Sequence, residues 1–294
     1  MLKIKLNNYL HLHLLVFIWG FTAILGALIK IDAIPLVWYR MLFAVVLVFI
    51  YFLITKKPFK LTPSALLKFV FSGILIALHW IAFFSAIKVS NVSIALVAMS
   101  TGALFTSLIE PLFFKRRLIF LELIFGLIVI SGLYLIFNVE SEYTLGIIYA
   151  LIASFLSALF TVLNGLFIKQ YSADTISFYQ LLFGVLFITI YIYFSYGFTY
   201  EKFSVTTSDI VYLLILSSFC TAYAFIASVK IMKHLTPYTV MLTINLEPVY
   251  GIILAVIIFG EKEKMSSQFY IGALIILVTV IANGIIKNKK KRLT

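Results

Sequence analysis

A carboxylate and a proline stand side by side in the middle of an apolar stretch. Glu247 and Pro248 lie in the segment TINLEPVYG, near the centre of an apolar run over 236–260. If this run crosses a bilayer, an ionised Glu247 costs at least about 2.5 kcal/mol on insertion scales. Pro248 adds polarity because it has no N–H and leaves the carbonyl of Ile244 without its helical partner. Polar groups at that depth are tolerated only beside protein or a wet cavity, so Glu247 must be protonated, paired or hydrated.

The residues around Glu247 predict a polar face on one helix. Thr243, Glu247, Tyr250 and Gly251 share a face by i, i+3 and i+4 spacing, and we expect this face to look into a cavity. One hypothesis is that the Glu247 carboxyl binds an ammonium group or takes up a proton during a cycle of binding and release. The alternative is a neutral acid that is hydrogen-bonded to a neighbouring helix. The sequence leaves both open.

His79 and Trp80 form a second polar point within an apolar run. A histidine can change its charge near neutral pH, and an indole offers a flat apolar surface with one donor. Together they suit a small amphipathic solute. The alternative for each residue is an interhelical hydrogen bond or simple packing.

Further candidates lie on other apolar runs. Met99, Gly102 and Thr106 share a face, where small residues favour close helix packing over ligand binding. A cavity position is kept open for these residues, of which Met99 enters the predicted binding set, because this segment is equivalent to the Glu247 region in a repeat described below. The predicted substrate-binding set is Trp19, His79, Trp80, Met99, Asn164, Tyr223, Thr243, Glu247 and Tyr250. Glu247 and His79 are the candidates for proton coupling, and neither a metal nor a cofactor is predicted.

Two other charged residues receive less weight. Arg40 lies about two turns inside one end of its run, so we expect it to snorkel to the outer headgroups, with pairing to a carboxylate as the alternative. Glu110 lies near Lys115 and is expected to be solvated at the inner surface.

The composition of the whole chain is that of a protein embedded in a lipid bilayer. The 294 residues are 63% hydrophobic and only 12% charged, with a mean hydropathy of +1.13. Apolar runs recur from end to end, each close to the roughly 20 residues that a membrane helix needs. The ten predicted spans are 11–29, 34–54, 64–87, 92–114, 119–138, 144–168, 175–195, 209–230, 236–260 and 267–287. The predicted fold is therefore an all-α polytopic membrane protein.

The net charge of +12 is explained by topology. With both termini cytoplasmic, most of the 23 lysines and arginines fall on the inner side, as the positive-inside rule requires. The basic tail at 287–292 then lies beside anionic lipid headgroups. Membrane lipid is thus an expected partner and nucleic acid is not. In a bacterial cell, the expected location is the cytoplasmic (inner) membrane.

The chain repeats itself. WYRMLFAV at 38–45 matches FYQLLFGV at 178–185, and IAFFSAIK at 81–88 matches YAFIASVK at 223–230. The predicted units are 1–139 and 140–294, with five spans each, and because five is odd the second must be inverted. Accordingly, the basic loop KKPFK at 56–60 has a mixed-charge counterpart near 201–209. Inverted repeats are typical of secondary transporters that work by alternating access. The alternative is a duplication that merely builds a stable bundle.

The same residues carry a family resemblance. The five-plus-five layout resembles the EamA type of the drug/metabolite transporter superfamily, as do WG at 19–20, HW at 79–80, SNVS at 90–93, EPLFFKRR at 110–117 and LEPVYGIILAVIIFGEK at 246–262. The resemblance implies export, or less often import or exchange, of small metabolites such as amino acids. It also implies a cavity lined by the helices other than the fifth and tenth. One departure is that Ala103 aligns with Pro248, which predicts a helix break in the second half alone.

The sequence thus predicts a secondary transporter of small organic metabolites that acts as an exporter. Protons are a candidate coupling ion. No G-x-x-x-x-G-K-[ST] phosphate loop is present, which argues against ATP-driven pumping within this chain. One alternative is a membrane-embedded enzyme acting on lipid, which would need clustered acid, base or metal-binding residues near one interface. Another is a noncatalytic membrane scaffold or sensor.

Overall fold

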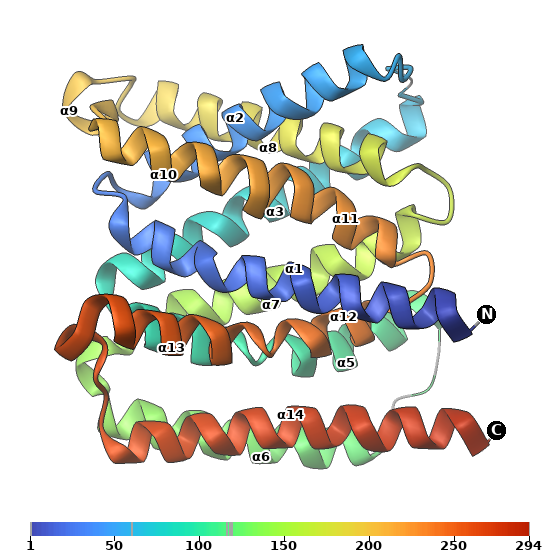
Figure 1. Cartoon of the computed structure of the whole chain (residues 1–294), viewed down its shortest axis with the longest axis vertical. Coiled ribbons are helices and arrows are strands. Elements are labelled where there is room, and N and C mark those ends of the chain that lie inside the picture. The colour runs from blue at the N-terminus through green and yellow to red at the C-terminus, as the bar shows by residue number, and fades with distance from the viewer. Residues whose placement is uncertain (1, 60, 116, 118–119, 294) are drawn as a thin grey trace.

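The computed structural model of the chain is a bundle of helices (Figure 1). It describes residues 2–59, 61–115, 117 and 120–293. The α-helices in chain order are α1 (Leu2–Leu28), α2 (Ala33–Ile54), α3 (Pro63–Val89), α4 (Val92–Met99), α5 (Gly102–Phe114), α6 (Phe120–Val139), α7 (Thr144–Phe167), α8 (Ala173–Ser195), α9 (Tyr200–Phe203), α10 (Thr207–Ser217), α11 (Ala224–Ile231), α12 (Pro237–Ile244), α13 (Glu247–Phe259) and α14 (Ser267–Leu293). A π-helical turn, η2 (Ser218–Tyr223), joins α10 to α11, and short 3-10 turns are η1 (Ser141–Tyr143) and η3 (Gly260–Glu263).

Most of the predicted spans are found as long apolar helices. Among the described residues, eight helical segments are long and apolar enough to cross a membrane. They correspond to the predicted spans other than the fifth and tenth. In those two, the apolar helices Ile124–Asn138 and Ser267–Thr279 are shorter. The all-α prediction is confirmed for the described part of the chain, whereas a count of ten membrane-spanning helices remains a prediction.

The fourth span is broken, as is the ninth. The ninth separates into α12 and α13 around Asn245 and Leu246, and the fourth separates into α4 and α5 around Ser100 and Thr101. The expectation of a break in the second half alone is therefore wrong. The sequence argument relied on proline, and the first half reaches the same shape without it.

Hydroxyl groups lie at the break that has no proline. The Ser100 hydroxyl donates back to the carbonyl of Leu96 at 3.3 Å, and the Thr101 hydroxyl lies 2.8 Å from the carbonyl of Ala98. Such local bonds compete with the regular helical pattern. Ser154 of α7 then donates to the freed carbonyl of Met99 at 3.1 Å. Neighbouring helices thus satisfy the backbone that the break exposes, as non-helical backbone in a membrane requires.

The two broken helices pack against each other in a crossed manner. The half-helix α4 contacts α13, and α5 contacts α12. At one end the Glu263 carboxylate accepts the N–H groups of Val92 and Ser93, both at 2.9 Å, and so caps the start of α4. At the other end the Glu110 carboxylate accepts the N–H of Tyr238 at 3.2 Å near the start of α12. Glu110 is only 5% exposed, so the expectation that it is solvated is wrong.

Glu263→Ala is expected to destabilise the folded protein by about 1–3 kcal/mol, because it leaves buried N–H donors at the start of α4 without an acceptor. Thermal unfolding in detergent should show a lower midpoint temperature than the wild type. Glu261→Ala is the matched control: its side chain is 86% exposed and pairs with Lys264 at the surface, so its loss should change the midpoint little. Equal midpoints for the two variants would contradict the capping role.

The outermost layer is formed by α6 and α14. These helices contact each other and lie side by side at one edge of the molecule (Figure 1). The main core lies in the other helices, where α3 packs against α7 and α8. The helices α3 and α10 both begin after a threonine cap, Thr62 and Thr206. Their first turns lie at opposite ends of the bundle (Figure 1).

Candidate functional site

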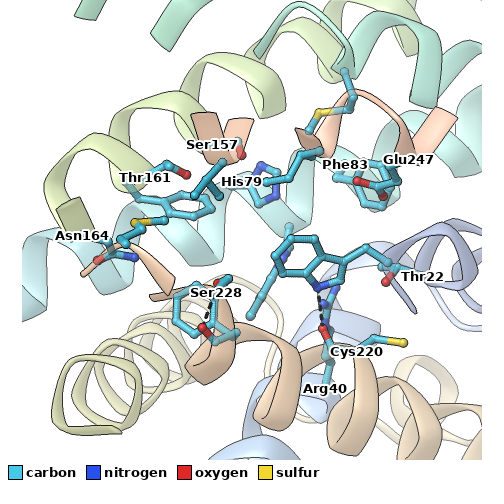
Figure 2. Close-up of a pocket in the computed structure, with 18 residues that line it drawn as sticks. Thr22, Arg40, His79, Phe83, Ser157, Thr161, Asn164, Cys220, Ser228 and Glu247 are labelled. Atoms are coloured by element: carbon cyan, nitrogen blue, oxygen red, sulfur yellow. Dashed lines mark hydrogen bonds between the residues drawn. The ribbon is translucent and has the colours of Figure 1, made fainter. Parts of the chain in front are cut away.

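A cavity of about 80 Å³ lies among the central helices (Figure 2). One water needs roughly 10–15 Å³ of such space, so the cavity has room for several waters or a small solute. The residues that line it are Trp19, Thr22, Arg40, His79, Trp80, Phe83, Met99, Ser157, Phe160, Thr161, Asn164, Cys220, Phe225, Ser228, Met232, Val240, Ile244 and Glu247. They come from both halves of the chain. Neither α6 nor α14 contributes one of these lining residues, in line with the expectation for the fifth and tenth spans.

Glu247 is the first residue of α13 and faces the cavity directly after the helix break (Figure 2). The start of a helix favours a negative charge, because the unpaired N–H groups there carry partial positive charge. Glu247 also interacts electrostatically with Arg40. The break therefore presents the carboxyl to the cavity at a helix end of favourable polarity.

Arg40 of α2 does not reach the headgroups. It is 1% exposed and lines the cavity, so the expectation of snorkelling is wrong. Its Nε donates to the Thr221 hydroxyl oxygen at 2.7 Å, and its guanidinium carbon lies 4.0 Å from the centre of the Trp80 ring. A hydrogen bond and a cation–π contact hold the side chain inward, where the sequence pattern had suggested that it reaches outward.

His79 of α3 is anchored by the backbone of a neighbouring helix. Its Nδ1 lies 2.7 Å from the carbonyl oxygen of Ala153 in α7. A carbonyl oxygen can only accept, so Nδ1 carries the hydrogen, and the lone pair of the neutral ring is on Nε2. The ring also packs edge-on against Phe160, with the ring centres 5.3 Å apart. The orientation of His79 in the cavity wall is therefore fixed by α7.

One face of α7 supplies a row of polar groups. Ser157, Thr161 and Asn164 follow one another along this helix at i, i+4 and i+7 and line the cavity (Figure 2). The Asn164 side-chain oxygen accepts from Gln180 at 2.7 Å, while its Nδ2 is buried and has no hydrogen-bond partner among the residues that the structure describes. Sequence reasoning missed Ser157 and Thr161, although their helical spacing to Asn164 was a signal that could have found them.

The structure brings six of the nine predicted binding residues to the cavity. These are Trp19, His79, Trp80, Met99, Asn164 and Glu247. The Trp19 indole N–H donates to the carbonyl of Cys220 at 3.1 Å, which ties α1 to the π-helical turn.

The other three do not line the cavity. Tyr223 is 44% exposed, and its hydroxyl lies 2.9 Å from Nε2 of His11. Thr243 bonds back to the carbonyl of Thr239, and Tyr250 packs edge-on against Phe17 of α1. The expected common face is therefore not observed. The break at 245–246 changes the helical phase between Thr243 and Glu247, and Tyr250, although in the same helix as Glu247, packs toward α1.

The comparison with known proteins agrees with this arrangement. The model of the EamA-like transporter family matches the chain twice, over residues 8–138 and 144–284. The chain belongs to the EamA-like transporter family. This EamA-like protein is therefore an integral, multi-pass membrane transporter, and the resemblance noted from its motifs is confirmed.

Individual proteins are also similar to this EamA-like chain. An uncharacterized transporter from Clostridium kluyveri is 25% identical over 241 residues, which cover 78% of this chain and 76% of the relative. A protein of known crystal structure superposes with a TM-score of 0.69 over 94% of this chain and 96% of its own, at 14% identity. The second similarity concerns the fold alone.

Proposed function

We propose that this EamA-like protein is a secondary transporter that carries small organic metabolites across the membrane by alternating access. Amino acids and related amphipathic solutes are the proposed class. The observation that carries the proposal is the central cavity, in which the ionisable groups of Glu247 and Arg40 interact between helices of both halves. Ionisable residues within membrane spans usually mark a substrate or ion pathway. The indoles of Trp19 and Trp80 supply an apolar surface beside these charges.

Alternating access is supported by the way the broken helices pack. Discontinuous helices that meet near the membrane centre are a recurrent feature of secondary transporters with inverted repeats. Here α4 contacts α13 and α5 contacts α12, so each half of one broken helix contacts one half of the other. Rocking one repeat against the other would change both contacts in opposite senses, which would open the cavity toward one face while closing it toward the other.

The proposed direction is export. The excess of lysine and arginine on the inner side of the predicted topology supports cytoplasmic termini, and the family resemblance favours release to the outside. In a bacterial cell the protein would act in the cytoplasmic membrane.

Protons are the proposed coupling ion, with Glu247 as the main proton carrier and His79 as the second. The charged or titratable groups that interact around this point are Arg40, Glu247, His79 and Cys220. Arg40 interacts with the other three, so proton binding at Glu247 would alter the field at the whole cavity.

Purified protein in liposomes, challenged with a panel of metabolites under imposed pH gradients, tests the proposed function. We expect concentrative flux of one solute class, which collapses when an ionophore removes the gradient. Flux that persists without proton movement would remove the coupling and leave a facilitator or exchanger. A wild-type protein that moves no member of the panel under any gradient would contradict transport of this solute class.

A further inference from the structure

Arg40 is held in place without having its hydrogen-bonding capacity used up. A guanidinium has five N–H donors in a planar fork. Among the described residues, Nε makes the one hydrogen bond recorded for this side chain, to Thr221, while Nη1 is buried and has no partner. A buried charged donor without an acceptor is costly, so this arrangement points to an acceptor that arrives from the cavity.

The π-helical turn orients the Arg40 side chain through Thr221. Thr221 lies within η2, and its hydroxyl donates to the carbonyl of Leu216 at 2.8 Å. Since its hydrogen is engaged there, the Thr221 oxygen presents a lone pair to Nε of Arg40. Single π-helical turns inside α-helices frequently occur at functional sites. The Trp80 ring packs against the guanidinium and restricts its position further. The N–H groups that do not bond to Thr221 are therefore held in place before a ligand arrives.

The other ionisable group among the cavity-lining residues that could pair with Arg40, the Glu247 carboxyl, leaves the guanidinium open. Glu247 interacts with Arg40 electrostatically, yet within the part of the chain that the structure describes no ion pair or hydrogen bond joins the two side chains. The cavity therefore contains a cationic fork on α2 and a separate carboxyl on α13.

We propose that Arg40 is the anion-binding group of the cavity and receives the carboxylate, or a similar planar oxyanion, of the transported solute. This deepens the proposed function and rests on it. Thr221 and Trp80 act as positioning residues for the fork. The geometry suits a two-point contact, because a guanidinium matches the two oxygens of a carboxylate. Glu247 would then contact a different part of the same solute.

A native cysteine in the cavity wall can be used to probe this site. Cys220 is the only cysteine, lines the cavity and interacts electrostatically with Arg40. Its thiolate attacks the sulfenyl sulfur of a methanethiosulfonate, forms a mixed disulfide and releases methanesulfinate. Three reagents share this chemistry: the anionic 2-sulfonatoethyl, the cationic 2-(trimethylammonium)ethyl and the neutral methyl compound. The ratio of the anionic to the cationic rate reports the field in the cavity independently of thiol reactivity.

In the purified wild-type protein we expect this ratio to exceed that of glutathione by at least about tenfold, because a nearby cation attracts one reagent and repels the other. Arg40→Gln should bring the ratio close to the glutathione value, Arg40→Lys should largely keep it, and Thr221→Val should lower it in part. Lys202→Gln, which removes an exposed charge on α9, is the matched control and should leave the ratio unchanged. The neutral reagent measures the reactivity of the thiol itself in each variant, and this factor is common to the two charged reagents and cancels in their ratio.

A wild-type ratio equal to that of glutathione would overturn the proposal even if Arg40→Gln fails to fold. Absence of reaction with the neutral reagent would overturn it as well, because the cavity beside Arg40 would then be closed to solutes. Flux measurements separate this inference from the proposed function. Wild-type flux that treats carboxylates and their amides alike would refute the anion site and leave transport intact. A high rate ratio without flux of any solute would refute transport and leave the anion site.

Discussion

Replacing Glu247 by Gln is expected to lower substrate flux in proteoliposomes at least about tenfold while the folded protein remains in the membrane. A hydrogen bond to a charged group is worth about 1.5–3 kcal/mol, and each 1.4 kcal/mol is a factor of ten in affinity. The amide keeps the size of the side chain and loses both its charge and its ability to release a proton. The loss should therefore appear in transport rather than in the midpoint of thermal unfolding.

Glu261→Gln is the matched control for Glu247→Gln. Glu261 lies in η3, shortly after α13, and is exposed at the surface, so its neutralisation should leave flux unchanged. If Glu247→Gln transports at the wild-type rate and with the same pH dependence, Glu247 is neither a substrate ligand nor a proton carrier.

Gly73→Ala is expected to lower the free energy of unfolding by about 1–3 kcal/mol, in the range typical of overpacked interfaces. Gly73 lies at a close approach between α3 and α8. A Cβ at this position would be 2.6 Å from the carbonyl oxygen of Gln180 and 3.1 Å from the N atom of Gly184. Both are backbone atoms, so the helices themselves must move apart. Fluorescence-detected size exclusion after heating should show a lower midpoint temperature.

Gly126→Ala supplies the comparison for Gly73→Ala. Its Cβ would meet the end of the Leu104 side chain at 2.8 Å, which can rotate away, so a smaller shift is expected. Because α3 also carries His79 and Trp80, Gly73→Ala should reduce flux as well as stability. A variant as stable as the wild type would show that the close contact between α3 and α8 is not required.

Much of the fold could be predicted from the sequence because a bilayer simplifies the problem. Each apolar run of about 20 residues has one stable outcome, a helix, since every backbone polar group needs a partner within it. Composition does not predict where a helix is interrupted without a proline. At the break of the fourth span, Ser100 and Thr101 bond to carbonyls within the chain and Thr101 bonds to Ser154 of α7, and a search for proline cannot find this.

The site was predictable where residue type alone decided the position. Glu247 and His79 are polar residues deep in apolar runs, and both face the cavity. Arg40 was misplaced because a long side chain near a span end has two destinations, and the choice depends on Thr221 and Trp80, which are distant in sequence. Thr243 was misplaced because helical spacing was counted across the break that separates it from Glu247, whereas Tyr250 lies in the same helix as Glu247 but packs against Phe17 of α1.

The central claim is that two oppositely oriented five-helix units enclose the cavity, and cysteine labelling from each side of the membrane tests it most directly. Ser64 and Ser208 are exposed and occupy the same position in the first turns of α3 and α10, two residues after the caps Thr62 and Thr206. In a Cys220→Ser background, Ser64→Cys and Ser208→Cys would each be treated with a membrane-impermeant maleimide in right-side-out and inside-out vesicles. We predict that Ser64→Cys is labelled only from the cytoplasmic side and Ser208→Cys only from the outside. Labelling of both from the same side would contradict the inverted arrangement and the transport mechanism that depends on it.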